Sequence, residues 1–111
     1  MKRSMKRLIL IAALTCSSAQ AEFKDGNRLL SQLQTSTHEY TNALGYIMGV
    51  ADTLQGVTHC PPANVTAGQL ADMVKQHLEG LPGLRHLAAD LHVAHVMKAT
   101  WPCAAKQGKP V

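Results

Sequence analysis

The apolar residues of this chain recur at helical spacing in separate stretches. In residues 27–34, Leu29, Leu30 and Leu33 fall on one helix face, and Asp25 just before them is a favourable N-cap residue. A second helix is predicted from His38, after the start signal of Ser36 and Thr37. Its apolar positions keep a three-four spacing and are Tyr40, Ala43, Leu44, Ile47, Met48, Ala51 and Leu54.

The strongest local signal begins the third predicted helix. Thr66 and Gln69 form a capping box, in which the Thr66 hydroxyl accepts from the backbone N–H of Gln69. Val65 and Leu70 occupy the two positions of a hydrophobic staple. The apolar face then continues through Leu70, Met73, Val74, His77 and Leu78. Gly80, Pro82 and Gly83 end this helix.

The last helix is predicted from about Leu87 to Thr100. Its apolar stripe is expected at Leu87, Leu91, Ala94, and Met97 or Lys98. Between the second and third helices, residues 56–64 contain Pro61 and Pro62 and cannot be helical throughout. No stretch alternates with period two for long enough to indicate a strand. The predicted fold is therefore a small all-α, four-helix domain.

The N-terminus has the order of features that marks a secretory signal peptide. Basic residues come first, at Lys2, Arg3, Lys6 and Arg7, and an apolar run follows over residues 8–14. Ala19 and Ala21 then provide a small-x-small cleavage site. We expect a signal peptide over residues 1–21, a helical domain over 22–103 and a flexible tail over 104–111. The apolar run is too short for a membrane-spanning anchor, and lipidation at Cys16 is the weaker alternative.

Removal of the signal peptide changes the charge of the protein. Four of the 11 Lys and Arg residues lie in residues 1–21, whereas all 7 Asp and Glu residues lie beyond them. The mature chain then has as many basic as acidic residues. Nucleic-acid binding loses its main support, because it requires a surplus of positive charge on one face.

Two cysteines remain after cleavage, Cys60 and Cys103. In a small exported domain such a pair usually forms a disulfide. The bond would close a loop of about 44 residues and contribute roughly 4 kcal/mol in the chain-entropy treatment. Two free thiols or a metal-binding pair are the alternatives.

Catalytic and metal-binding patterns are weak in this chain. His92 and His95 lie three residues apart on a predicted helix, and His77 and His86 precede them, but the spacing of a zinc site is missing. We expect surface or half-buried histidines and no functional metal or cofactor. Ser31 and Ser36 lack the strand-turn-helix setting of a catalytic serine. The protein is therefore not expected to be an enzyme.

Several short segments in order resemble the Rap/Tai immunity proteins of type VI secretion systems. These segments are residues 27–30, 44–50, 60–61, 65–69, 85–87 and 101–103, so that the resemblance covers about residues 23–103. It implies a periplasmic protein that binds a peptidoglycan amidase toxin tightly and blocks its active-site cleft. It also implies a possible homodimer.

The resemblance implies roles for individual residues as well. Cys60 and Cys103 would form the family's disulfide, and Gly45, Tyr46 and Gly49 would be packing residues within the bundle. Arg85 and His86 would be a structural pair at the start of the last helix. Many family members carry two further cysteines at positions that here hold Leu33 and Ala43.

Two segments are candidates for entering a toxin cleft, residues 56–64 and residues 81–85. The polar side chains within them that could reach a partner are His59, Asn64 and Arg85. The alternative is that both segments are only connectors. Two other functions also remain open: a periplasmic acid-stress chaperone, and a family member that has no toxin partner.

Overall fold

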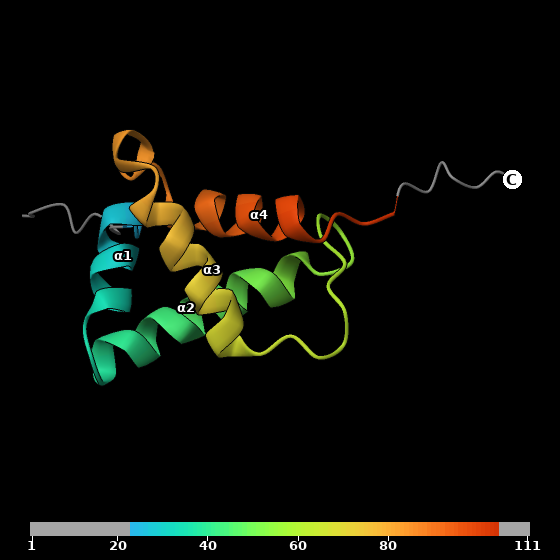
Figure 1. Cartoon of the computed structure of the whole chain (residues 1–111), viewed down its shortest axis with the longest axis horizontal. Coiled ribbons are helices and arrows are strands. Elements are labelled where there is room, and N and C mark those ends of the chain that lie inside the picture. The colour runs from blue at the N-terminus through green and yellow to red at the C-terminus, as the bar shows by residue number, and fades with distance from the viewer. Residues whose placement is uncertain (1–22, 105–111) are drawn as a thin grey trace, which may run out of the picture.

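The computed structural model describes residues 23–104, and four α-helices and one 3-10 turn follow one another in this part of the chain. They are α1 (Gly26–Gln34), α2 (His38–Leu54), α3 (Ala67–Glu79), η1 (Pro82–Leu84) and α4 (Ala89–Thr100). The prediction of an all-α, four-helix domain is confirmed (Figure 1). The predicted signal peptide and the tail beyond Ala104 lie outside the described residues.

The predicted caps begin two of the helices. The Asp25 carboxylate accepts from the backbone N–H of Arg28 at 2.8 Å, at the start of α1. The Thr66 hydroxyl accepts from the backbone N–H of Gln69 at 3.1 Å, at the start of α3. Each bond satisfies one of the N–H groups that a first helical turn leaves without an intrahelical partner.

The core lies where all four α-helices contact one another. Its buried apolar side chains are Leu29, Leu30, Leu33, Ala43, Ile47, Ala51, Leu70, Ala71, Val74, Leu78, Ala89, Val93, Val96 and Met97. Removal of this apolar surface from water is the main force that holds the helices together. Leu33 and Ala43, the positions at which the resemblance implies two further cysteines, are both part of this core.

The start of α4 differs from the prediction. The helix begins at Ala89, because the backbone just before it pairs with the segment that leads into α1. Gly26 N–H donates to the Leu87 carbonyl at 2.9 Å, and Ala89 N–H donates to the Lys24 carbonyl at 2.9 Å. This pairing joins residues far apart in sequence, so local patterns do not reveal it.

The predicted apolar stripe of α4 was wrong except at Met97. Leu91 is 59% exposed and Leu87 is exposed as well, whereas the buried positions are Ala89, His92, Val93, Val96 and Met97. The buried positions also follow helical spacing, but their centre lies on roughly the opposite side of the helix from Leu87 and Leu91. His92 occupies a core position on the buried face, and its polar character made the opposite face look more apolar.

Two connecting segments lie at opposite ends of the bundle (Figure 1). The long connection between α2 and α3 lies beside the end of α4. The η1 turn projects from the bundle near the start of α1. These are the two segments that the sequence singled out as candidates for partner binding.

Candidate partner-binding surface

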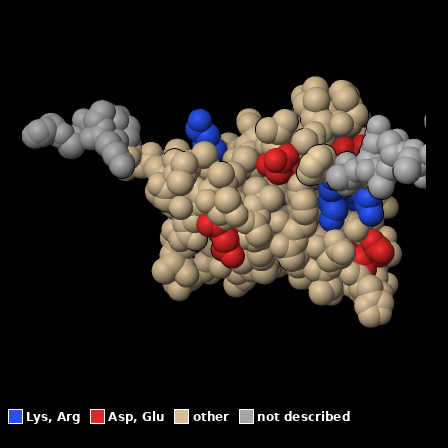
Figure 2. Space-filling model, turned by 180° about the vertical axis from the view of Figure 1, so that it is seen from behind, with Lys and Arg blue, Asp and Glu red and all other residues tan. Residues whose placement is uncertain are grey.

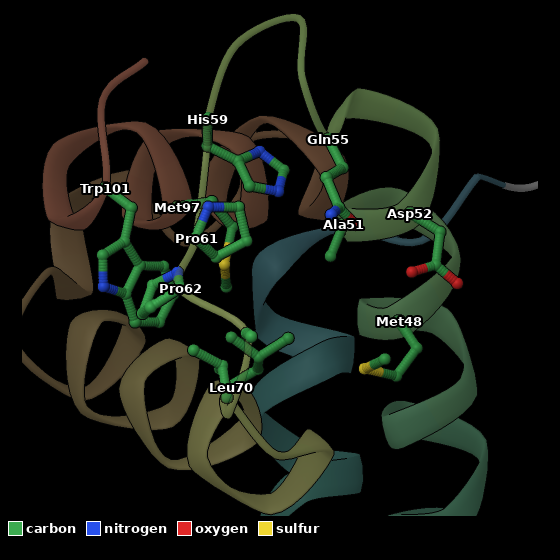
Figure 3. Close-up of a pocket in the computed structure, with 12 residues that line it drawn as sticks. Met48, Ala51, Asp52, Gln55, His59, Pro61, Pro62, Leu70, Met97 and Trp101 are labelled. Carbon is green, nitrogen blue, oxygen red and sulfur yellow. The ribbon is translucent and has the colours of Figure 1, made fainter. Parts of the chain in front are cut away.

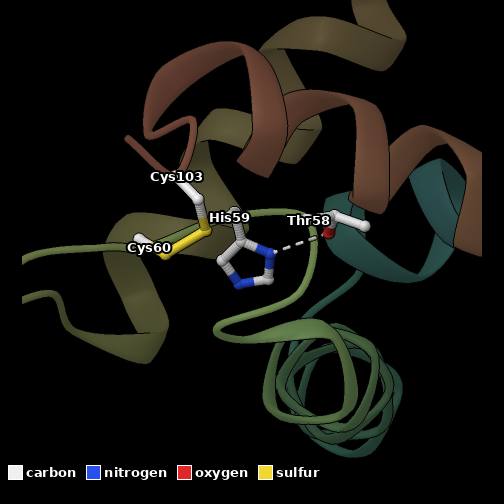
Figure 4. The surroundings of a disulfide bond; sticks show 4 residues. All are labelled: Thr58, His59, Cys60 and Cys103. Atoms are coloured by element: carbon white, nitrogen blue, oxygen red, sulfur yellow. Dashed lines mark hydrogen bonds between the residues drawn. A yellow bond between two sulfur atoms is a disulfide. The ribbon is translucent and has the colours of Figure 1, made fainter. Parts of the chain in front are cut away.

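The disulfide end of the domain, defined here as residues 55–64 and 101–103, is fixed by covalent and backbone bonds. Cys60 and Cys103 form a disulfide with their Cα atoms 4.7 Å apart, which confirms the predicted pair (Figure 4). Cys60 N–H also donates to the Trp101 carbonyl at 2.8 Å. The segment after α2 is therefore held against the end of α4 by two adjacent links.

A tight turn precedes the disulfide. Gly56 N–H donates to the His59 carbonyl at 2.8 Å, and both Val57 and Thr58 N–H groups donate to the Leu54 carbonyl at 3.0 Å. Gly56 has a φ of +82°, a conformation that favours glycine. Val57 lies within this turn with 73% of its surface exposed. The turn thus presents an apolar side chain on a rigid backbone.

His59 does not take the place expected of a partner-binding residue. Its side chain is only 1% exposed, and its Nδ1 lies 3.4 Å from the Thr58 hydroxyl (Figure 4). A side chain buried to this degree can be reached only through the pocket that it lines, so His59 does not lie on the surface, and its role in partner binding stays a prediction. Asn64 is exposed, as a contact residue must be.

A small pocket opens beside this turn. Its volume is about 170 Å³, and it lies between α2, the segment around Pro61, and Trp101 (Figure 3). His59 lines it from within, and Asp52 and Gln55 line it with exposed side chains. The pocket thus presents polar and apolar surface side by side.

The histidine end of the domain, defined here as residues 24–27 and 81–88 with His77 and His92, is held by hydrogen bonds. Asn27 N–H donates to the Arg85 carbonyl at 2.9 Å, beside the Gly26 bond to Leu87. A Cβ at Gly26 would lie 2.7 Å from the Arg85 carbonyl oxygen and 2.9 Å from the His92 ring. Only glycine allows this close approach.

His92 is the buried polar residue that links this end together. It is 5% exposed, and its Nε2 lies 2.9 Å from the Leu84 carbonyl oxygen. Because a carbonyl can only accept, Nε2 donates there, and Nδ1 accepts from His77 Nε2 at 3.2 Å. This buried network contradicts the expectation of surface or half-buried histidines for His92.

His77 and His95 form a cluster of histidine side chains together with His92. The rings of His77 and His95 have centroids 5.4 Å apart. Burial lowers the pKa of His77 below its ordinary value, and charge repulsion from His92 and His95 lowers it further. Within residues 23–104, no group of three or more His, Cys, Asp or Glu side chains is placed to hold a metal ion.

Arg85 and His86 have different surroundings. Arg85 is half-buried, and its buried Nε has no hydrogen-bond partner within residues 23–104. Its backbone carbonyl, rather than its side chain, makes the contact with α1. His86 is exposed. No side-chain hydrogen bond between the two is found in the described part of the chain.

The two glycines of α2, Gly45 and Gly49, border a groove and do not form a close contact between helices. A Cβ at Gly45 or Gly49 would meet no other atom within 4 Å, so the expected close approach of another backbone is wrong for the described residues. Both glycines border an apolar groove between α2 and α4 that also includes Leu91. Tyr46 packs against the core beside them, and Lys24 Nζ lies 4.6 Å from its ring centroid.

On the face seen in Figure 2, basic side chains at one side lie next to acidic ones, and most of the remaining surface is uncharged. No broad basic patch of the kind that binds nucleic acid is visible on that face. Among the helices of residues 23–104, none is long and apolar enough to cross a membrane.

Comparison with known proteins identifies a family for most of the chain. A family model described as Rap1a immunity proteins matches residues 15–103, which include nearly all of the described domain. Among curated proteins, none matches the chain.

Proposed function

Because the chain belongs to the Rap1a immunity protein family, we propose that it binds and inhibits a peptidoglycan amidase that a type VI secretion system delivers into the periplasm. Rap1a immunity proteins are non-enzymatic inhibitors, so the protein acts by binding and not by catalysis. The family match is the observation that carries this proposal. The Cys60–Cys103 disulfide supports a location outside the cytoplasm, since such bonds persist in oxidising compartments.

The toxin-binding surface is the disulfide end of the domain. A rigid segment loses little conformational entropy on binding, which favours tight inhibition. The turn beside the disulfide exposes Val57 and has its backbone N–H groups already bonded. The exposed Asn64 follows on the same segment. An exposed apolar side chain beside a preformed pocket gives a partner apolar surface to remove from water.

Affinity capture tests the function itself. Tagged residues 22–111 with the disulfide intact are incubated with periplasmic extracts of the source organism and of its competitors. The expected result is a stoichiometric peptidoglycan hydrolase in the eluate, whose cleavage of peptidoglycan stops when the protein is added. An eluate without a hydrolase from every extract contradicts the proposal.

Two matched variants test the binding surface. Val57→Asp introduces a charge at the disulfide end, and Leu84→Asp introduces the same charge at the exposed η1 turn. We expect Val57→Asp to weaken toxin binding at least 100-fold, corresponding to about 2.7 kcal/mol. Leu84→Asp should leave the affinity unchanged. The reverse pattern would move the toxin-binding surface to the η1 turn.

The location and the mature form have separate tests. Mass spectrometry of the protein from the periplasmic fraction should show a chain that begins at Glu22. A chain that still begins at Met1 would contradict cleavage. Light scattering of the same sample tests the homodimer that the resemblance implies.

A further inference from the structure

The pocket at the disulfide end has the size of a single side chain. Its volume of about 170 Å³ is close to that of cavities of about 150 Å³ that bind a molecule as large as benzene. Met48, Leu70, Met97 and Trp101 contribute apolar surface to its walls (Figure 3). A ligand that fits must therefore have an apolar portion.

Polar groups face the same space. The His59 ring lines the pocket, and its only side-chain hydrogen bond within residues 23–104 joins Nδ1 to the Thr58 hydroxyl. When Nδ1–H donates to this hydroxyl, Nε2 remains as an acceptor. The Asp52 carboxylate lies across the pocket from Trp101 (Figure 3). No side-chain hydrogen bond within residues 23–104 uses that carboxylate, so it too is available as an acceptor.

The pocket is formed before any ligand arrives. The Cys60–Cys103 disulfide and the Cys60 bond to the Trp101 carbonyl hold two of its walls together. Pro61 and Pro62 restrict the backbone of the segment that borders it. Binding therefore requires little ordering of the protein, which increases the affinity available from a small contact.

We propose that this pocket binds an arginine side chain of the toxin. The methylene stem of arginine packs on the apolar walls, including the indole of Trp101, and its guanidinium reaches the polar side of the pocket. The guanidinium N–H groups donate to the Asp52 carboxylate and to His59 Nε2, both of which accept. A carboxylate or phosphate ligand would meet the negative charge of Asp52 and is excluded. This inference rests on the proposed function for the identity of the partner, but the pocket can be tested without it.

A small probe tests the pocket directly. N-butylguanidinium chloride carries the head and stem of arginine, and N-butylurea is its neutral counterpart of similar shape. The full mature protein is titrated with each at constant ionic strength, and the fluorescence of Trp101, the one tryptophan of the chain, is followed. We expect a saturable change with N-butylguanidinium and binding at least tenfold weaker with N-butylurea. Equal binding of the two probes, or binding of neither, overturns the proposal.

Two aspartate variants test whether the charge of Asp52 contributes to binding of the probe. Asp52→Asn should weaken N-butylguanidinium binding about fivefold, the effect of a partly exposed ion pair. Asp72→Asn removes an equally exposed carboxylate that does not line the pocket, and should leave binding unchanged. Equal effects of the two variants would show that the probe responds to overall charge, which overturns the assignment to Asp52. Thermal melting checks that both variants remain folded.

Binding measurements with a captured toxin distinguish failure of this inference from failure of the proposed function. If a captured amidase binds Asp52→Asn at least fivefold more weakly than the unchanged protein and Asp72→Asn equally well, the pocket is part of the interface. If the amidase binds all three proteins equally, the arginine assignment is overturned and the immunity function stands. If no amidase is captured, the proposed function fails, and the pair of probes still decides whether the pocket binds a guanidinium group.

Discussion

At the disulfide end, the segment after α2 is joined to the end of α4 by a covalent bond, whereas at the histidine end η1 and the start of α1 are joined by hydrogen bonds. Both ends expose an apolar side chain, Val57 at the first and Leu84 at the second. The disulfide is broken by reduction and is little affected by pH. The histidine network depends on which ring nitrogens carry protons. The same small domain thus uses two kinds of constraint that fail under different conditions.

Under the proposed function the difference matters, because an inhibitor in the periplasm would meet variable pH but an oxidising environment. A binding surface held by a disulfide keeps its shape across that range. The histidine end can change its stability without moving the Val57 turn, since the two ends lie on opposite sides of the core (Figure 1). The comparison can be tested by disturbing each end in turn.

Removal of the disulfide should have the largest effect. The double variant Cys60→Ser, Cys103→Ser is expected to lose about 4 kcal/mol of unfolding free energy, the chain-entropy value for a loop of this length. Denaturant unfolding measures the loss. Reduction of the unchanged protein should reproduce it, and reduction of the double variant should have no further effect. A loss below about 1 kcal/mol would show that backbone bonds alone hold the disulfide end.

Crowding of the histidine end should have the next largest effect. Gly26→Ala places a methyl group against the Arg85 carbonyl and the His92 ring, and should cost about 2–3 kcal/mol as overpacking. Gly45→Ala is the matched control, because a Cβ there meets nothing within 4 Å. It should stabilise α2 by up to about 1 kcal/mol through helix propensity. Equal effects in thermal melts would contradict the close approach at Gly26.

Acid should weaken the histidine end selectively. Burial and the neighbouring His92 and His95 lower the pKa of His77 in the folded protein below the ordinary value of 6.5. The unfolded chain therefore takes up a proton at a higher pH than the folded chain does. The stability that neutral His77 contributes is complete above pH 6.5 and is lost as the pH falls towards its folded pKa. The melting temperature should decrease over this interval.

The His77→Gln variant assigns that pH dependence. Glutamine can still donate a hydrogen bond towards His92 but does not titrate. We expect a flatter dependence of melting temperature on pH below about 6.5, while the response to reduction of the disulfide stays the same. An unchanged pH profile would mean that other groups cause the acid effect.

Substitution of the exposed apolar side chains at the two ends should have the smallest effects on stability. Val57→Ser and Leu84→Ser each remove an exposed apolar side chain and should change the unfolding free energy by no more than about 0.5 kcal/mol. Paired melts of the two variants measure this. A loss above 1 kcal/mol at either site would show that the tip packs against the domain, which would weaken its assignment as a surface for binding.

Features of the fold that depend on local sequence were predictable. Asp25 and Thr66 cap their helices as expected, because a side-chain oxygen needs only the N–H group a few residues ahead of it. The disulfide pair followed from the two cysteines that remain after the predicted signal peptide. The candidate segments were also recognisable, since glycine and proline interrupt the helical pattern there.

The roles of individual residues at those segments were harder to predict. His59 and Asn64 lie five residues apart in one connection, yet His59 is buried by packing against the end of α4 and Asn64 is exposed. A polar side chain in a loop is usually at the surface, and that expectation failed at His59. The buried His59 ring lines the pocket, which no pattern in the sequence indicated.

The sequence by itself determined which stretches are helical, where two of them begin and which cysteines pair, because propensity, capping and oxidation act over short range or on composition. Only the tertiary structure decided which face of α4 is buried, since apolar residues recur at helical spacing on both the predicted and the observed face. The buried face includes His92, whose ring forms hydrogen bonds with the Leu84 carbonyl and with His77. A buried polar group is acceptable only when such partners are present, and those partners come from distant parts of the chain.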